Sequence, residues 1–121
     1  MKTLTRSTVA VLPLLAVLAG CNTMDPPTAQ LAQAKTQVEN ADTADAEQYA
    51  ALSMKRAQEK IDQAEHAMDE KEYLKAKRLA EQATADARLA EATAQTEKLK
   101  QALDEVNKNL DALKSELDAR S

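Results

Sequence analysis

The sequence contains no phenylalanine or tryptophan, and only two tyrosines among 121 residues. A thick mixed core needs large aromatic and β-branched side chains, so this scarcity argues against one. The only glycine is Gly20, and the prolines are Pro13, Pro26 and Pro27. From residue 28 to residue 121 the chain therefore lacks both of the residues that most often interrupt a helix.

The most abundant residue types favour helices. Ala, Glu, Gln, Lys, Asp and Leu dominate the composition, which is typical of helical bundles and coiled coils. The length leaves room for one small domain. The net charge is −4, and an acidic body repels phosphate backbones and anionic lipid surfaces. We therefore expect an all-α fold and no binding of nucleic acid. A single cysteine, Cys21, excludes an internal disulfide.

Residues 1–20 have the layout of an export signal. Lys2 and Arg6 form a charged start, and residues 9–19 form an apolar stretch that ends in small side chains. A bilayer-spanning helix needs about 20 apolar residues, so this stretch is too short to span a membrane. The pattern predicts a cleaved signal peptide over residues 1–20.

The end of this segment, Leu18-Ala19-Gly20-Cys21, resembles the lipobox of bacterial lipoproteins. In that family the cysteine thiol receives a diacylglyceryl group, the peptide is cut before the cysteine, and the new amino terminus is usually acylated. The resemblance implies that Leu18, Ala19 and Gly20 direct cleavage and that Cys21 carries the lipid. The alternative is an ordinary export signal followed by an unmodified cysteine.

A lipid on Cys21 would act as a stable anchor. One acyl chain holds a protein only marginally, whereas two or three hold it firmly, because each buried methylene contributes ~0.8 kcal/mol. In Gram-negative lipoproteins an aspartate after the cysteine favours retention in the inner membrane. The resemblance, with Asn22 at this position, implies an outer-membrane location facing the periplasm.

Three helical segments are predicted after a short lipidated tether of residues 21–27. They cover about 28–41, about 46–68, and a third stretch that begins near Glu72 and runs toward the C-terminus. In each, small or apolar residues recur every three or four positions, which places them on one helix face. The three stripes are Leu31, Ala34, Val38 and Ala41; Ala50, Met54, Ala57, Ile61, Ala64 and Met68; and Tyr73, Ala76, Ala80, Ala83, Ala87, Ala90 and Ala94.

Polar stretches separate these segments. "NADTAD" covers residues 40–45 and "MDEKEY" covers residues 68–73, where Asp69 is a candidate cap for the next helix. Alanine stripes let helices approach closely. We therefore predict an antiparallel helical hairpin or a short three-helix bundle over residues 28–94. One long rod is the alternative, because neither polar stretch contains Gly or Pro.

Residues 95–121 carry a different pattern, a leucine seam of a/d type about three heptads long. Its members are spaced 4, 3, 4, 3 and 4 residues apart: Leu99, Leu103, Val106, Leu110, Leu113 and Leu117. The same register continues back through Thr96 and Ala92. The seam predicts a coiled coil, most simply with a second copy of the chain. Folding back onto the chain's own bundle is the alternative, and the flanking positions carry no strong charge code.

Residues 46–92 resemble a domain of unknown function found in small Gram-negative envelope lipoproteins, where it sometimes precedes an OmpA-like domain. The matching features are Tyr49-Ala50, Lys55-Arg56-Ala57, Tyr73, Arg78-Leu79-Ala80-Glu81-Gln82-Ala83 and Asp86-Ala87. That family often has Pro where Ala51 stands and Asp or Asn where Glu72 stands. These departures predict that the helix starts near Ala51 and Glu72 are less sharply defined in this chain. The family supplies no catalytic residues.

Little in the sequence points to chemistry. His66, the only histidine, falls off the apolar stripe and should face water. A cluster of carboxylates near residues 65–72 is expected to cap and solvate helix ends, with weak calcium binding as the alternative. Tyr49 and Tyr73 are expected to cover the ends of the bundle rather than to contact a ligand. We expect no catalytic residue, cofactor or metal site, and the protein is not expected to be an enzyme.

The sequence therefore predicts an outer-membrane-anchored periplasmic lipoprotein with a structural or protein-interaction role. Its expected partners are the membrane, through Cys21, and either further copies of itself or a helical protein, with non-covalent proximity to peptidoglycan possible. One alternative is a periplasmic chaperone or adaptor. Another is an envelope spacer resembling the Braun-type lipoprotein, without that protein's covalent peptidoglycan linkage because the final residue is Ser121 and not lysine.

Overall fold

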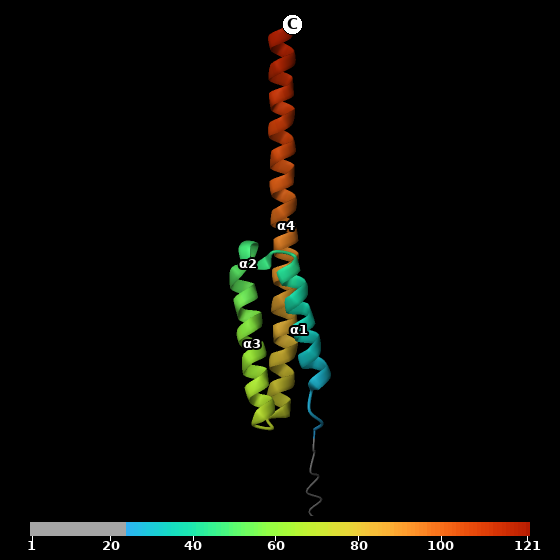
Figure 1. Cartoon of the computed structure of the whole chain (residues 1–121), viewed down its shortest axis with the longest axis vertical. Coiled ribbons are helices and arrows are strands. Elements are labelled where there is room, and N and C mark those ends of the chain that lie inside the picture. The colour runs from blue at the N-terminus through green and yellow to red at the C-terminus, as the bar shows by residue number, and fades with distance from the viewer. Residues whose placement is uncertain (1–23) are drawn as a thin grey trace, which may run out of the picture.

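The computed structural model describes residues 24–121, and all regular structure in this range is helical. The helices are α1 (Thr28–Thr43), α2 (Ala46–Tyr49), α3 (Ala51–Asp69) and α4 (Tyr73–Arg120). Helices α1, α3 and the first half of α4 form a bundle, and the second half of α4 continues beyond it as a single helix (Figure 1). The expected all-α bundle with a long C-terminal helical extension is confirmed.

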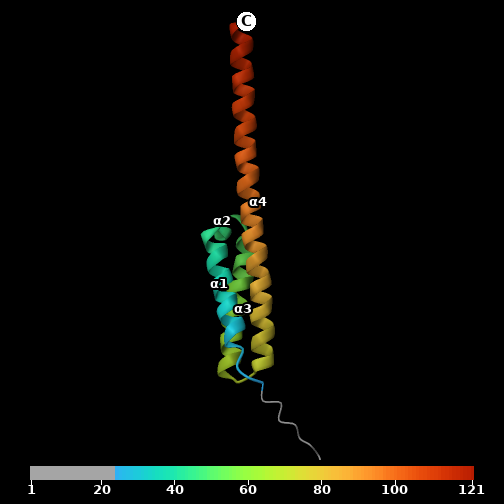
Figure 2. The same ribbon diagram turned by 90° about the vertical axis from the view of Figure 1, so that its right-hand side faces the viewer.

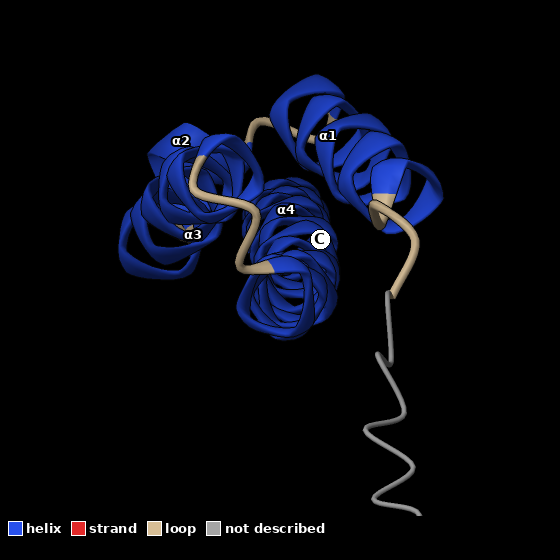
Figure 3. Ribbon diagram, turned by 90° about the horizontal axis from the view of Figure 1, so that it is seen from below, coloured by secondary structure: helices blue, strands red, loops and turns tan. Residues whose placement is uncertain are grey.

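Helix α4 is the centre of the bundle. Viewed along the long axis, it lies between α1 and α3 (Figure 3). Helices α1 and α4 run in one direction and α3 in the other, as two perpendicular views show (Figures 1 and 2). Met24 lies beside the turn that joins α3 to α4. The two ends of the described chain therefore lie at opposite ends of the molecule.

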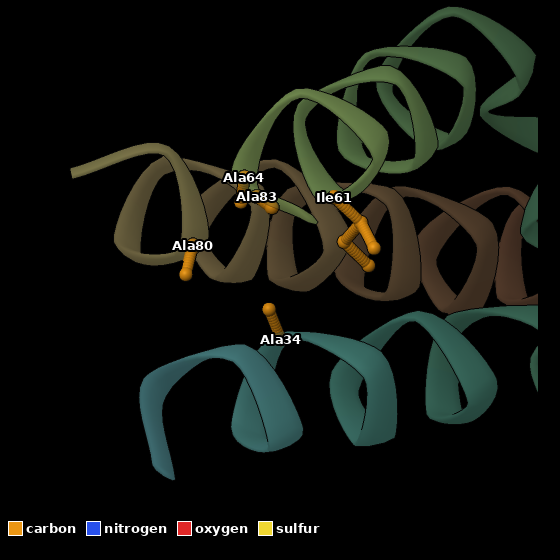
Figure 4. Close-up of a cluster of buried hydrophobic side chains, with 5 residues drawn as sticks. All are labelled: Ala34, Ile61, Ala64, Ala80 and Ala83. Atoms are coloured by element: carbon orange, nitrogen blue, oxygen red, sulfur yellow. The ribbon is translucent and has the colours of Figure 1, made fainter. Parts of the chain in front are cut away.

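The core consists almost entirely of alanine. Its lower layer combines Ala34 of α1, Ile61 and Ala64 of α3, and Ala80 and Ala83 of α4 (Figure 4). An upper layer joins α1, α2, α3 and α4 through Ala41, Ala46, Met54, Ala90 and Ala94. Met54 and Ile61 are the only large apolar side chains that are buried among the described residues. Small side chains allow close approach of the helix axes, which compensates for the absence of bulky residues.

Most buried positions follow the stripes expected from the sequence, although four stripe members other than Met68 are only half-buried: Leu31, Val38, Ala50 and Tyr73. Three further differences concern Ala46, Ala67 and Thr84, and Ala46 is buried one turn before the expected start of its stripe. Ala67 is buried where the pattern favoured Met68, which is only half-buried at the end of α3. Thr84 joins the buried face of α4, and its hydroxyl donates a hydrogen bond to the Ala80 carbonyl at 2.9 Å. That internal bond satisfies the hydroxyl, so its burial leaves no polar atom without a partner.

The turn between α3 and α4 is a Schellman motif built without glycine. The Glu72 N–H donates to the Ala67 carbonyl at 2.8 Å, and the Lys71 N–H donates to the Met68 carbonyl at 3.0 Å. Lys71 holds the left-handed conformation with φ of 60°, a position that usually belongs to glycine. Asp69 was expected to cap α4, but it is the last residue of α3. Glu72 occupies the N-cap position of α4 instead, without a side-chain capping bond.

The turn between α1 and α2 is also built on a left-handed residue. Asp45 has φ of 62°, and aspartate tolerates this region better than most residues. Its carboxylate forms an ion pair with Lys98 of α4, which ties the turn to the central helix. The chain thus turns inside the polar stretch that the sequence marked at residues 40–45.

The expected continuous helix over residues 46–68 is wrong, because the chain bends at Ala50. This residue has φ of −141° and ψ of 36°, and it separates the four-residue α2 from α3. The absence of proline at Ala51 therefore does not remove the break. Tyr49 packs against the upper core layer, and its hydroxyl donates to Gln101 Oε1 of α4 at 3.1 Å. The bend lets α2 close the end of the bundle, which was the role expected of Tyr49.

Polar contacts join each pair of the three main helices around the alanine core. Lys35 of α1 pairs with Glu65 of α3 at 2.5 Å, and Gln37 of α1 donates to Glu91 of α4 at 2.6 Å. Lys60 of α3 forms a partly buried ion pair with Asp86 of α4. Exposed pairs contribute little to stability, whereas the partly shielded Lys60–Asp86 pair also fixes the register of α3 against α4.

We predict that Lys71→Gly stabilises the bundle. A non-glycine residue in the left-handed region costs roughly 1–2 kcal/mol, part of which is offset by the greater freedom of glycine in the unfolded chain. The expected gain is up to about 1 kcal/mol in the free energy of unfolding, measured by urea denaturation. Gln63→Gly, at an exposed position inside α3, is the matched control and should lose about 1 kcal/mol. A loss in both variants would contradict the assignment of the turn.

We also predict that Ala83→Leu destabilises the bundle by about 1–3 kcal/mol, because Ala83 is fully buried between α1 and α3 and has no room for added methylenes. The measurement is the shift of the thermal unfolding midpoint followed by circular dichroism. Ala32→Leu on the exposed face of α1 should leave the midpoint nearly unchanged. Equal midpoints for the two variants would show that the helices are not packed through alanine.

Candidate functional site

The outstanding surface feature is the row of leucines along the extension of α4. The six residues of the predicted seam keep between about half and three quarters of their surface exposed: Leu99 71%, Leu103 60%, Val106 53%, Leu110 49%, Leu113 56% and Leu117 65%. Every residue from Leu99 to Ser121 is exposed. The seam therefore does not fold back onto the chain's own bundle, which was the alternative drawn from the sequence. A continuous exposed apolar row is the usual place to look for an interaction surface, so the seam is the candidate site of this protein.

The seam lies on the face of α4 opposite the buried alanine stripe. At 100° per residue, positions such as Ala83, Ala87, Ala90 and Ala94 project to one side of the helix, and the leucines project to the other. One continuous helix therefore carries two apolar faces with different uses. The first faces α1 and α3, and the second faces outward.

The outward face begins before the end of the bundle. Leu89 is 55% exposed, and it precedes Ala92, Thr96 and Leu99 by three, seven and ten residues. These intervals keep the heptad register of the seam. Sequence reasoning missed Leu89, although the same 3–4 spacing carried back one step beyond Ala92 would have found it. From Leu89 to Leu117 the exposed seam covers about four heptads.

The extension owes its helical form to local sequence. Its residues are good helix formers, and pairs such as Lys100–Glu97 at 2.7 Å and Arg120–Glu116 at 2.5 Å each add a few tenths of a kcal/mol. Its base is fixed to the bundle by Lys98, through Asp45, and by Gln101, through Tyr49. The leucines are therefore presented on a helix whose direction the bundle sets.

The histidine and the carboxylates singled out in the sequence give weaker indications of a functional site than the seam. His66 is exposed at the last turn of α3, as its spacing predicted. Glu65 pairs with Lys35, and within residues 24–121 no three metal-binding side chains of the His, Cys, Asp or Glu type converge. Near the α3–α4 turn the Glu72 carboxylate accepts a hydrogen bond from Lys75 at 2.6 Å, which raises the pKa of Lys75. The Glu72 carboxylate thus pairs with a side chain one turn into α4 and does not cap a backbone N–H of that helix.

An open hollow lies at the end of the bundle beside Met24. It is lined mainly by the first turns of α4, including Tyr73, Leu74 and Arg78. Tyr73 is half-buried there, at the end of the bundle opposite Tyr49. The lining mixes alkyl groups with lysine and glutamate side chains that already pair with each other, so it presents no converging set of reactive groups.

The predicted lipidation and cleavage residues, Leu18, Ala19, Gly20 and Cys21, lie outside the described residues. Within the part of the chain that the structure describes, none of the helices combines the length and the apolar character that crossing a bilayer requires. The seam leucines are thus the only residues of the predicted sites whose surroundings the structure describes.

The bundle and the outward leucine face together define an all-α protein with an exposed helical extension. Residues 29–106 match a family model described as "Domain of unknown function (DUF4398)". The match covers more than half of the chain, and the protein belongs to this family. The resemblance noted over residues 46–92 therefore extends through α1 and into the seam as far as Val106. No curated protein and no solved structure matches the chain.

Proposed function

We propose that this protein is a lipid-anchored lipoprotein of the outer membrane, facing the periplasm, and that it acts through protein–protein interaction. Cys21 is the anchor, residues 22–27 are the tether, and the bundle is the base from which α4 reaches outward. The leucine seam is the interaction surface.

The observation that carries the proposal is the exposure of the seam along a continuous helix. Burying a leucine side chain completely contributes about 1.5–3 kcal/mol, so covering the exposed half of each seam residue contributes roughly 1 kcal/mol. Six such residues on one face give a strong drive toward a partner. The alanine-lined interior of the bundle, by contrast, is already filled and offers little surface to a client protein.

The direction of α4 supports the anchoring half of the proposal. Met24 lies at one end of the bundle, and the seam projects from the other (Figure 1). A chain held at Cys21 would therefore carry its apolar face away from the bilayer. The 48 residues of α4 span about 72 Å at 1.5 Å per residue. This length would place the tip of the seam well into the periplasm.

The anchor is tested by fractionation of cells expressing the Cys21→Ser variant. Without a thiol no diacylglyceryl group can be attached, so we expect the variant to leave the membrane pellet and the wild type to remain there. Asn22→Asp is the matched control, since it keeps the thiol and should shift the protein to the inner membrane. Equal membrane content of Cys21→Ser and the wild type would refute the anchor.

The seam is tested by analytical ultracentrifugation of the Cys21→Ser protein. We expect an oligomeric mass that falls to the monomer when Leu103 and Leu110 are both changed to Lys, because charged side chains cannot be buried in the seam. The control changes Lys108 and Ser115 on the opposite side of the extension to Ala and should keep the oligomer. An unchanged mass in the double lysine variant would reject the seam as the interaction surface.

A further inference from the structure

We propose that the seam from Leu89 to Leu117 pairs with the same seam of a second copy, parallel and in register. This inference rests on the proposed function, because the anchor determines the orientation. It goes further by naming the partner, its direction, and the part of the bundle surface that takes part.

The seam reaches the length of a stable coiled coil when the bundle half of α4 takes part. A coiled coil needs apolar a and d positions over at least three to four heptads. The extension alone supplies about three. The exposed positions on the bundle half of α4 add the fourth: Leu89 and Ala92 are apolar, and Thr96 is the one polar member, whose hydroxyl donates to the Ala92 carbonyl at 2.8 Å. These residues project away from α1 and α3, so a second α4 can lie along them without disturbing the core.

Charge is the second argument, and it favours a copy of the chain over a different helix. In a parallel, in-register pair each g position faces the e position five residues later in the partner. The facing pairs are Arg88–Thr93, Gln95–Lys100, Ala102–Asn107, Asn109–Lys114 and Glu116–Ser121. No pair joins two charged residues, so self-association meets no repulsion. A partner of different sequence is usually selected by charges at these positions, and the seam carries no such code.

The tether supplies the orientation. From Cys21 to Pro27 the chain can extend at most about 20 Å. In an antiparallel pair that uses the whole seam, the two copies cross near Leu103, and their Tyr73 ends stand about 90 Å apart. In the proposed function α4 stands upright on the membrane, and in that orientation only one of the two tethers of an antiparallel pair could reach it. In a parallel pair both Met24 ends lie at the same end of the assembly, as a shared membrane requires.

The test is disulfide crosslinking of the full chain in intact cells. Ala92→Cys places a thiol at a d position, where the two copies face each other in a parallel, in-register pair. Ser115→Cys, at the outward f position, is the matched control. A disulfide requires Cα atoms within about 7 Å, so we expect at least about tenfold more covalent dimer from Ala92→Cys than from Ser115→Cys. The dimer should disappear when Leu103 and Leu110 are also changed to Lys.

Two results would overturn the pairing. One is a covalent dimer from Ala92→Cys no more abundant than from Ser115→Cys. The other is an Ala92→Cys dimer that persists with both lysines present, since the contact would then not depend on the seam. The unmodified chain separates this proposal from the anchor. Its only thiol is Cys21, so a disulfide dimer of that chain would show an unlipidated cysteine and contradict the anchor, while Ala92→Cys in a Cys21→Ser background still reports the pairing.

Discussion

Close contact between alanine side chains is the constraint on which the structure depends. The chain has no phenylalanine or tryptophan, and residues 24–121 contain only two large buried apolar side chains, so bulky side chains cannot hold the bundle together. It is held by close packing, because methyl groups on α1, α3 and the first half of α4 let these backbones approach closely enough for dispersion to act along the whole bundle. The polar pairs around this core fix the register more than they add stability.

Packing through small side chains leaves part of the α4 surface free. A helix that packs through alanines on one side has the other side free for a second apolar face, and α4 uses this freedom along about four heptads. The two faces overlap in sequence between Leu89 and Ala94, where one turn contributes to both. The bundle thus serves to orient the seam as well as to fold, and the ties from Lys98 and Gln101 fix the seam's base.

Much of this architecture could be predicted because helical periodicity is a strong signal in a chain without Gly or Pro after residue 27. The alanine stripes and the leucine seam follow from spacing alone. The break at Ala50 was missed because Ala51 stands where the resembling family often has proline, so the residue that would mark the start of α3 is absent from this sequence. The glycine-free turn at Lys71 was similarly hidden, because the hydrogen bonds that define it come from the backbone. Leu89 fits the spacing of the seam, but it was missed because it lies between residues of the alanine stripe, which follows the same 3–4 spacing on another face of α4.

Helix α4 runs unbroken from Tyr73 to Arg120 and contains no proline, so the extension is a direct continuation of the helix at the centre of the bundle. A tilt of about ten degrees where the extension leaves the bundle moves the tip sideways by roughly 6 Å, given a length of about 33 Å for residues 99–120 at 1.5 Å per residue. Any force that reaches the tip is transmitted to the contacts of Lys98 with Asp45 and of Gln101 with Tyr49. The same stiffness that holds the leucines in one row therefore also makes the molecule a mechanical link between its two ends.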